Sequence, residues 1–308
     1  MLDKAFILGV PRDQIVNFFG LVEYFANQAA RGPLPPSVEC HVECSIPAGE
    51  NLEPLPFAIP ECSPGISSKD FESQYVSEPR VAVFRGFAAD WIATEKWRNL
   101  SSLVQDHGHR LVPIELGSMM KSDGMKEQAM SFRSFVTSFL VPSSQKSLWT
   151  LADATDVSFA VAYLAQHPLL DQIPELCRDI IMSPRLCSSP PSHRNVWIGT
   201  GGTRTPLHFD SYDNLLIQIV GCKYVRVYDT CEADSLYVIR GTSKNDISAQ
   251  VNMSAVNCEM EDFEEHPLAK NAKYQEIYLG PGDSLFLPAR MWHYVRSLST
   301  SISVNFWY

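Results

Sequence analysis

The chain has 308 residues, of which 45% are hydrophobic and 19% are charged, and its formal net charge is −10. This length and composition are typical of one large or two modest globular domains with a hydrophobic core. The acidic balance argues against a nucleic-acid partner, whose binding surface is normally basic, and is compatible with a basic protein or peptide substrate. No apolar run approaches the length of a membrane span, so we expect no membrane partner.

The eight cysteines are spread along the whole chain, at a density too low for a disulfide-stabilised scaffold. Cys40 and Cys44 have the spacing of a metal-binding pair, but no second pair of that spacing accompanies them. Residues 1–10 lack the long apolar core of a secretory signal. We therefore expect reduced thiols and a location in the nucleus, the cytoplasm or both. The sequence does not predict the oligomeric state.

The first 78 residues differ in character from the rest of the chain. Apolar residues recur at helical spacing across residues 13–31, and residues 32–66 then carry many prolines. We interpret residues 1–78 as an N-terminal helix followed by a proline-rich connector that runs along the main domain. A compact domain is predicted for residues 79–308.

Residues 79–195 alternate between short apolar runs and helical patterns, and we interpret them as a lead-in of helices and strands. We predict strands at 81–84 and 111–116, helices at 91–104 and 132–140, and a loop with a short helix at 167–180.

From residue 196 onward the apolar pattern approaches a period of two, which is typical of strands. Residues 215–228 are predicted to form a hairpin with a tight turn at Gly221-Cys222. Further strands are expected at 284–288 and 301–307, and a long insertion loop at 241–275. The predicted fold is mostly β with flanking helices, as a sandwich or barrel whose core spans residues 196–308.

Three side chains in this region have the chemistry of a metal site. His208 and Asp210 are two residues apart, so on a regular strand both face the same side, and His293 follows on another predicted strand. Two imidazoles and one carboxylate are the ligand set of non-heme Fe(II) oxygenases. The alternative is three polar residues without a shared role, because a His-x-Asp pair alone is a weak signal.

The segments around these residues carry a more specific signal. Residues 163–176, 205–229 and 280–308 resemble the JmjC family of Fe(II)- and 2-oxoglutarate-dependent oxygenases, in the branch that includes Jumonji domain-containing protein 5. The resemblance covers roughly residues 79–308. It implies a double-stranded β-helix, the jelly-roll or cupin-type barrel. It also implies a dioxygenase with Fe(II), 2-oxoglutarate and O2 as cofactors, and His208, Asp210 and His293 as catalytic metal ligands.

The resemblance also implies a co-substrate site. Lys223 takes the place of the lysine that pairs with the distal carboxylate of 2-oxoglutarate, although without the metal ligands it would be interpreted as a solvated strand residue. Tyr163, Thr205 and Asn214 are expected to donate hydrogen bonds to the same co-substrate. Trp197 and Trp307 are expected to wall the pocket, although they are otherwise ordinary core aromatics. Asn305 on the last strand is expected to approach the co-substrate as well.

The substrate is less well defined by the sequence. The resemblance implies hydroxylation of a protein side chain, with an arginyl group as a candidate, and release of succinate and CO2. Glu115 matches an acidic position suited to a guanidinium, or is a surface carboxylate. Met120 and Met125 stand where the branch with Jumonji domain-containing protein 5 has aromatic residues, and this change weakens an aromatic cage for a cation. Histone lysine or arginine demethylation, hydroxylation of transfer RNA and a non-catalytic cupin-type binding module remain as alternatives.

Overall fold

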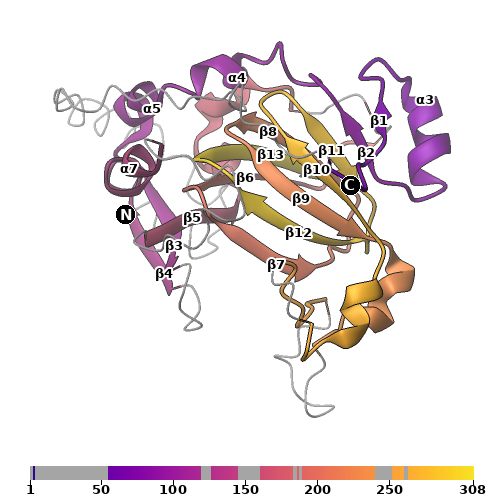
Figure 1. Ribbon diagram of the computed structural model, residues 1–308. Helices are drawn as coiled ribbons and strands as arrows, with labels where there is room; N and C mark the ends of the chain where they lie inside the picture. Colours follow the sequence, from indigo (N-terminus) through magenta and orange to yellow (C-terminus); the bar gives the residue numbers. More distant parts are fainter. Residues whose placement is uncertain are drawn as a thin grey trace.

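Two β-sheets pack face to face, and helices cover the outer side of one of them (Figure 1). The computed structural model describes residue 3 and residues 55–118, 126–144, 160–182, 186, 189–239, 252–259 and 263–308. No helix in these residues combines the length and the apolar character needed to cross a bilayer. The predicted β-rich fold with flanking helices, a jelly roll of the cupin type, is confirmed.

The smaller sheet holds both histidines of the predicted metal site. Its strands lie in the order β10-β9-β12-β7, and all neighbours are antiparallel. His208 on β7 and His293 on β12 are register partners, so the sheet places the two imidazoles side by side. The strands are β7 Arg204–His208, β9 Lys223–Tyr228, β10 Tyr274–Leu279 and β12 Trp292–Ser297.

The larger sheet has nine strands in the order β1-β2-β11-β8-β13-β6-β5-β3-β4, and only β1 and β2 pair in parallel. Its central strands β8 and β13 are buried on both faces. The strands are β1 Glu61–Cys62, β2 Ala82–Phe84, β3 Leu111–Ser118, β4 Lys126–Ser131, β5 Ala160–His167, β6 His193–Gly199, β8 Asn214–Val220, β11 Ser284–Leu287 and β13 Ser301–Trp307.

The helices are short, and most come before β6 in the chain (Figure 1). Two of them, η3 and η4, are π-helical, and η6, η7 and η8 are 3-10 helices. The full set is α3 Ser68–Phe71, η3 Glu72–Val76, α4 Ile92–Lys96, α5 Leu100–His107, α6 Phe132–Phe135, η4 Val136–Leu140, α7 Val141–Ser144, α8 Leu169–Gln172, η6 Pro174–Asp179, η7 Thr230–Ser235 and η8 Pro267–Asn271.

Three apolar clusters fill the layers of this fold. The first joins the helices to the outer face of the larger sheet, with residues such as Trp97 and Ile217. The second lies between the sheets and includes Val225 of β9 and Leu285 of β11. The third covers the outer face of the smaller sheet. Because the middle cluster occupies only part of the space between the sheets, the remaining part is open to polar side chains.

The predicted hairpin at 215–228 is wrong. β8 pairs with β11 and β13 in the larger sheet, whereas β9 pairs with β10 and β12 in the smaller one. The tight turn is present, but it is a corner that carries the chain from one sheet to the other. Gly221 adopts a φ of +73°, and a Cβ there would lie 2.0 Å from the carbonyl oxygen of Thr300. Two adjacent apolar runs predict two strands, but they do not reveal which partners the strands take.

Most other predicted elements are confirmed, but one predicted helix is two helices in the structure. The predicted helix at 91–104 is two helices, α4 and α5, because Asn99 starts a new helix by accepting a hydrogen bond from the backbone N–H of Ser102. The predicted helix at 132–140 consists of α6 and η4. Strands β2, β3, β11 and β13 lie where the sequence predicts them.

Several predictions lie outside the described residues: the helix at 13–31, the Cys40–Cys44 pair, and Met120 with Met125. The described end of the connector does run along the domain, since the backbone N–H of Ile59 donates to Glu276 on β10. Phe71 is fully buried in the helical cluster. The domain boundary near residue 79 stays a prediction.

Candidate active site

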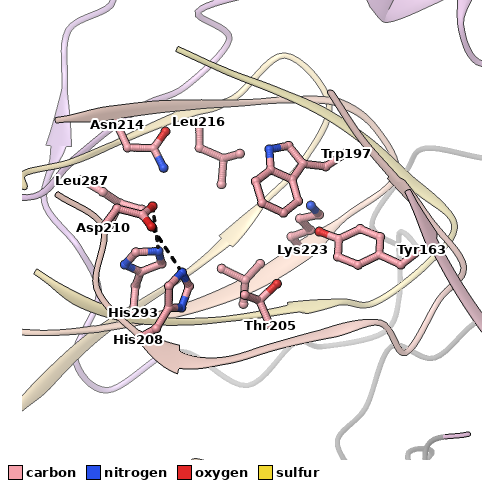
Figure 2. Close-up of a pocket in the computed structure, with 11 residues that line it drawn as sticks. Tyr163, Trp197, Thr205, His208, Asp210, Asn214, Leu216, Lys223, Leu287 and His293 are labelled. Carbon is pink, nitrogen blue, oxygen red and sulfur yellow. Dashed lines mark ion pairs between the residues drawn. The ribbon is translucent and has the colours of Figure 1, made fainter. Parts of the chain in front are cut away.

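His208, Asp210 and His293 converge at one end of the space between the sheets (Figure 2). Their potential ligand atoms all lie within 4.8 Å of one another. The Nε2 atom of His208 is 3.6 Å from Oδ1 of Asp210, and Nε2 of His293 is 3.7 Å from Oδ2. Asp210 lies beyond the end of β7, so the turn after the strand, rather than strand alternation, brings it next to His208.

The backbone orients both histidine rings. Nδ1 of His208 is 2.8 Å from the carbonyl oxygen of Pro206, and Nδ1 of His293 is 3.0 Å from that of Met291. A carbonyl oxygen can only accept, so each Nδ1 must carry the proton. Each Nε2 then faces Asp210 and is the ring nitrogen available to a metal, which is the arrangement that a metal ligand requires.

The electrostatics of the three groups also suit a cation. Burial, together with the nearby His208, lowers the pKa of His293 to about 3, so this imidazole is neutral at physiological pH. Burial raises the pKa of Asp210, whereas His208 and a hydrogen bond with Asn214 oppose that rise. Two imidazoles and one carboxylate on a single side of a cavity form the donor set of a facial iron site, so the residues present fit Fe(II).

A cavity extends from the three ligands between the two sheets (Figure 2). The three predicted metal ligands share this cavity with most of the residues predicted for the co-substrate, and its lining comes from both sheets. The lining residues are Tyr163, Trp197, Thr205, His208, Asp210, Asn214, Leu216, Lys223, Leu287, His293 and Val295.

Lys223 lies at the first position of β9, deep in this cavity, and is 2% exposed. Burial lowers its pKa to about 7, and no ion-pair partner for it occurs within the described part of the chain. Its Nζ atom is 5.9 Å from the centroid of the Tyr163 ring. Burial raises the pKa of the Tyr163 hydroxyl. An anionic ligand would relieve the isolated charge.

Asn305 and Trp307 lie outside the lining of the cavity, unlike the other residues predicted for the co-substrate. Asn305 is fully buried on β13 and hydrogen-bonds with both Asn214 and Trp197. Trp307 is the register partner of Asn214 and stacks on Tyr212, with ring centroids 5.2 Å apart. Asn305 therefore supports the cavity wall from behind, whereas Trp307 packs against Tyr212 and His193, outside the lining.

Glu115 also lies beside the cavity instead of in its lining. It is the register partner of Tyr163 on β5 and of Glu127 on β4, so the three side chains share one face of the sheet. Burial and the charge of Glu127 raise the pKa of the Glu115 carboxyl. Like charges directly opposite each other destabilise a sheet, so a cation between the two carboxylates would be favourable.

The sequence interpretation missed three lining residues, Leu216, Leu287 and Val295. Strand alternation carries part of the signal, because Leu216 is two residues after Asn214 and Val295 is two residues after His293. No such signal exists for Leu287, which reaches the cavity as the register partner of Asn214 in the larger sheet.

Comparison with known proteins gives consistent matches. The cupin-like domain family matches residues 68–308. JmjC domain-containing protein F of Dictyostelium discoideum is 38% identical over 77% of this chain and 59% of its own length. Lysine-specific demethylase 8 of Xenopus tropicalis is 35% identical over 79% of the chain and 51% of its own length. The chain thus spans little more than half of these two relatives.

A third relative matches over more of its length. Jumonji C domain-containing protein 5 of Drosophila melanogaster is 30% identical to this chain, and the match covers 100% of the chain and 72% of that protein.

Proposed function

Because the chain belongs to the JmjC family of cupin-like domains, we propose that it is an Fe(II)- and 2-oxoglutarate-dependent dioxygenase that hydroxylates a protein side chain. The observation that carries the proposal is the shared cavity. Three metal-ligand groups line one part of it, and another part is lined by Lys223, a buried side chain with no ion-pair partner among the described residues. A dicarboxylate that chelates the metal needs a positive partner for its remote carboxylate, and Lys223 supplies it.

Each residue has a defined task in this proposal. His208, Asp210 and His293 hold the iron, and the two backbone carbonyls keep the imidazoles aimed at it. When bound, iron and 2-oxoglutarate supply the chemistry by which O2 hydroxylates a C–H bond, with succinate and CO2 as co-products.

The walls of the cavity orient the co-substrate. Lys223 pairs with its distal carboxylate, and the Tyr163 and Thr205 hydroxyls donate hydrogen bonds to the same end. Trp197, Leu216 and Leu287 exclude water from the space between the two ends. Exclusion of water strengthens the ion pair with Lys223, because charges interact more strongly at low dielectric.

For the substrate we propose a basic side chain on a protein or peptide. Glu115 and Glu127 face each other beside Tyr163, and a guanidinium or ammonium group would offset their repulsion. The net charge of −10 favours a basic partner over a nucleic acid. Cys62, Cys231 and Cys258 are free thiols, in keeping with the proposed nuclear or cytoplasmic location.

Demethylation is the second candidate, and the names of two relatives favour it: lysine-specific demethylase 8 and lysine-specific demethylase JMJ30. Both reactions begin with hydroxylation of a C–H bond. They diverge only when the hydroxylated carbon is a methyl group on nitrogen, which is then lost as formaldehyde. The identity of the product therefore separates the two candidates.

The test is incubation with Fe(II), 2-oxoglutarate and peptides that present arginine, lysine, methyl-lysine, histidine or asparagine. We expect succinate release that depends on iron and on one peptide class, and a product heavier by one oxygen atom. A product that has lost a methyl group would establish the demethylase instead. His208→Ala should abolish succinate release, and succinate release that survives in this variant would refute the proposed site.

A further inference from the structure

Three side chains connect the far wall of the cavity to the metal-ligand carboxylate. Nε1 of Trp197 donates to Oδ1 of Asn305 at 2.9 Å, and Nδ2 of Asn305 donates to Oδ1 of Asn214 at 3.0 Å. Figure 2 shows the amide nitrogen of Asn214 on the side that faces the Asp210 carboxylate, and this amide lowers the pKa of Asp210 against the effect of burial. The residues lie on β6, β13 and β8 and in the turn after β7.

The side chains at the two ends allow only one donor-to-acceptor direction along this series of hydrogen bonds. The indole of Trp197 has one N–H and can only donate, whereas an ionised Asp210 can only accept. Each amide between them has one donating and one accepting end. Asn305 must therefore turn its oxygen to Trp197 and its nitrogen to Asn214. Asn214 must then turn its own nitrogen to Asp210.

Burial makes this direction costly to reverse. Asn305 is fully buried and Asn214 is 7% exposed, so an amide turned the wrong way has no water to satisfy it. β13 is paired on both sides, with β6 and with β8, and its backbone therefore holds Asn305 between the two partners. Reversal at any one amide would leave two oxygens, or two N–H groups, facing each other in the next link.

We propose that Asn305 is a positioning residue for the metal centre. It orients the Asn214 amide so that this amide donates to Asp210 and holds the carboxylate against the two histidines. Asn305 itself touches neither metal nor co-substrate, and its effect passes through Asn214. The inference rests on the proposed metal site.

The variant that tests it is Asn305→Leu, which keeps the branched shape and removes both hydrogen-bonding ends. The measurement is the affinity of the full chain for Mn(II) alone, followed by the electron paramagnetic resonance signal of free Mn(II). We expect affinity about tenfold weaker or more, as is typical when an outer partner of a metal ligand is lost. An affinity equal to that of the unsubstituted protein would overturn the proposal.

A matched control lies on the same strand. The Ser303 hydroxyl is equally buried and donates to Gln218 at 2.7 Å, but it has no link to the metal ligands. Ser303→Ala should leave the Mn(II) affinity unchanged, although it removes a buried hydrogen bond from β13. An equal loss of affinity in both variants would mean that the effect comes from general loosening of the strand, and the proposal would fail.

Two further variants show whether the effect follows the chain of side chains. Trp197→Phe keeps an aromatic ring but removes the indole N–H at the far end, and it should weaken Mn(II) binding severalfold, which also provides the test if Asn305→Leu does not fold. Asn305→Leu should have no additional effect once Asn214→Ala has cut the link to Asp210. Additive losses in this double variant would contradict transmission through Asn214.

The same Mn(II) measurement separates a failure of the proposed metal site from a failure of the positioning role of Asn305. If the unsubstituted protein itself binds no Mn(II), the metal site is wrong. If it binds and only the dependence on Asn305 is missing, the metal site stands and the positioning role is wrong.

Discussion

Strand β9 carries two cations on its opposite faces, the partly buried Arg226 and the buried Lys223, and their surroundings differ. Arg226 points to the outer face, where its guanidinium donates to the Tyr224 hydroxyl and to the Cys258 carbonyl oxygen, both at 2.9 Å, and lies 3.9 Å from Glu276. Lys223 points into the cavity, where its nearest described aromatic partner is the Tyr163 ring at 5.9 Å.

The pKa values of the two cations move in opposite directions. Burial alone would lower the pKa of Arg226, but Tyr224 and Tyr228 outweigh that effect and the pKa is raised. Burial acts unopposed on Lys223 and lowers its pKa to about 7. A charge with partners, such as Arg226, stabilises the folded protein, whereas a buried charge without a partner among the described residues, such as Lys223, destabilises it until an anion binds. We therefore expect Arg226 to contribute to folding and Lys223 to contribute to ligand binding.

The largest expected effect is on folding, at the outer cation. Arg226→Met leaves the Glu276 carboxylate, which is 4% exposed, buried without its cation. We expect a loss of about 4 kcal/mol in the free energy of unfolding. Urea denaturation measures it, and 2-oxoglutarate affinity serves as the control because the substitution faces away from the cavity. A loss below about 1 kcal/mol would show that the Arg226 network is not structural.

At the inner cation the expectation is reversed. Lys223→Met removes an isolated buried charge, so the metal-free protein should be as stable as before or more stable. Its affinity for 2-oxoglutarate should fall about 100-fold, since the distal carboxylate loses its partner. Calorimetric titration in the presence of Mn(II) gives both the affinity and a check that the metal site survives. Unchanged affinity would remove Lys223 from the co-substrate site.

A third substitution moves a cavity wall without changing any charge. A Cβ at Gly199 would lie 2.7 Å from Cδ2 of Tyr163, so Gly199→Ala must displace that ring. We expect 2-oxoglutarate to bind about tenfold more weakly, with Mn(II) affinity unchanged. Gly65→Ala is the matched control, because its nearest contact would be Ser63 at 3.7 Å. Similar affinities in both variants would mean that Tyr163 does not contribute to binding.

The smallest expected effect is the pH dependence of stability that Lys223 causes. Its folded pKa of about 7 is below the ordinary value of 10.5, so between these limits the folded protein binds fewer protons than the unfolded chain. Stability relative to Lys223→Met should therefore rise with pH through this window, by about 1 kcal/mol per unit. Thermal unfolding of the metal-free proteins at pH 7 to 9 measures it. A parallel pH profile in the two proteins would contradict a charge without a partner.

The sequence placed the candidate metal ligands and Lys223 in one site through residue type together with the family resemblance, and the structure brings them into one cavity. Pairing was not predictable, since the alternation in β8 and β9 is the same whether the two strands form a hairpin or belong to opposite sheets.

The hydrogen bonds between side chains behind the cavity walls could not be predicted from the sequence either. Asn305 has the alternation of a residue that faces the cavity, yet Asn214 and Trp197 cover it. Asp210 faces His208 through a turn and not through strand geometry, so its prediction as a metal ligand depends on residue type and family resemblance and not on the predicted strand.

The corner at Gly221 determines which of the two cations of β9 faces inward. Side chains alternate along a strand, so one inserted residue at this corner would exchange the faces of β9. Lys223 would then meet the outer tyrosines, and Arg226 would move to the inner face. Sheet pairing and composition would hardly change, but the proposed partner of the distal carboxylate would leave the cavity. The length of chain between Asn214 and Lys223 therefore matters to the proposed co-substrate site as much as the identity of either residue.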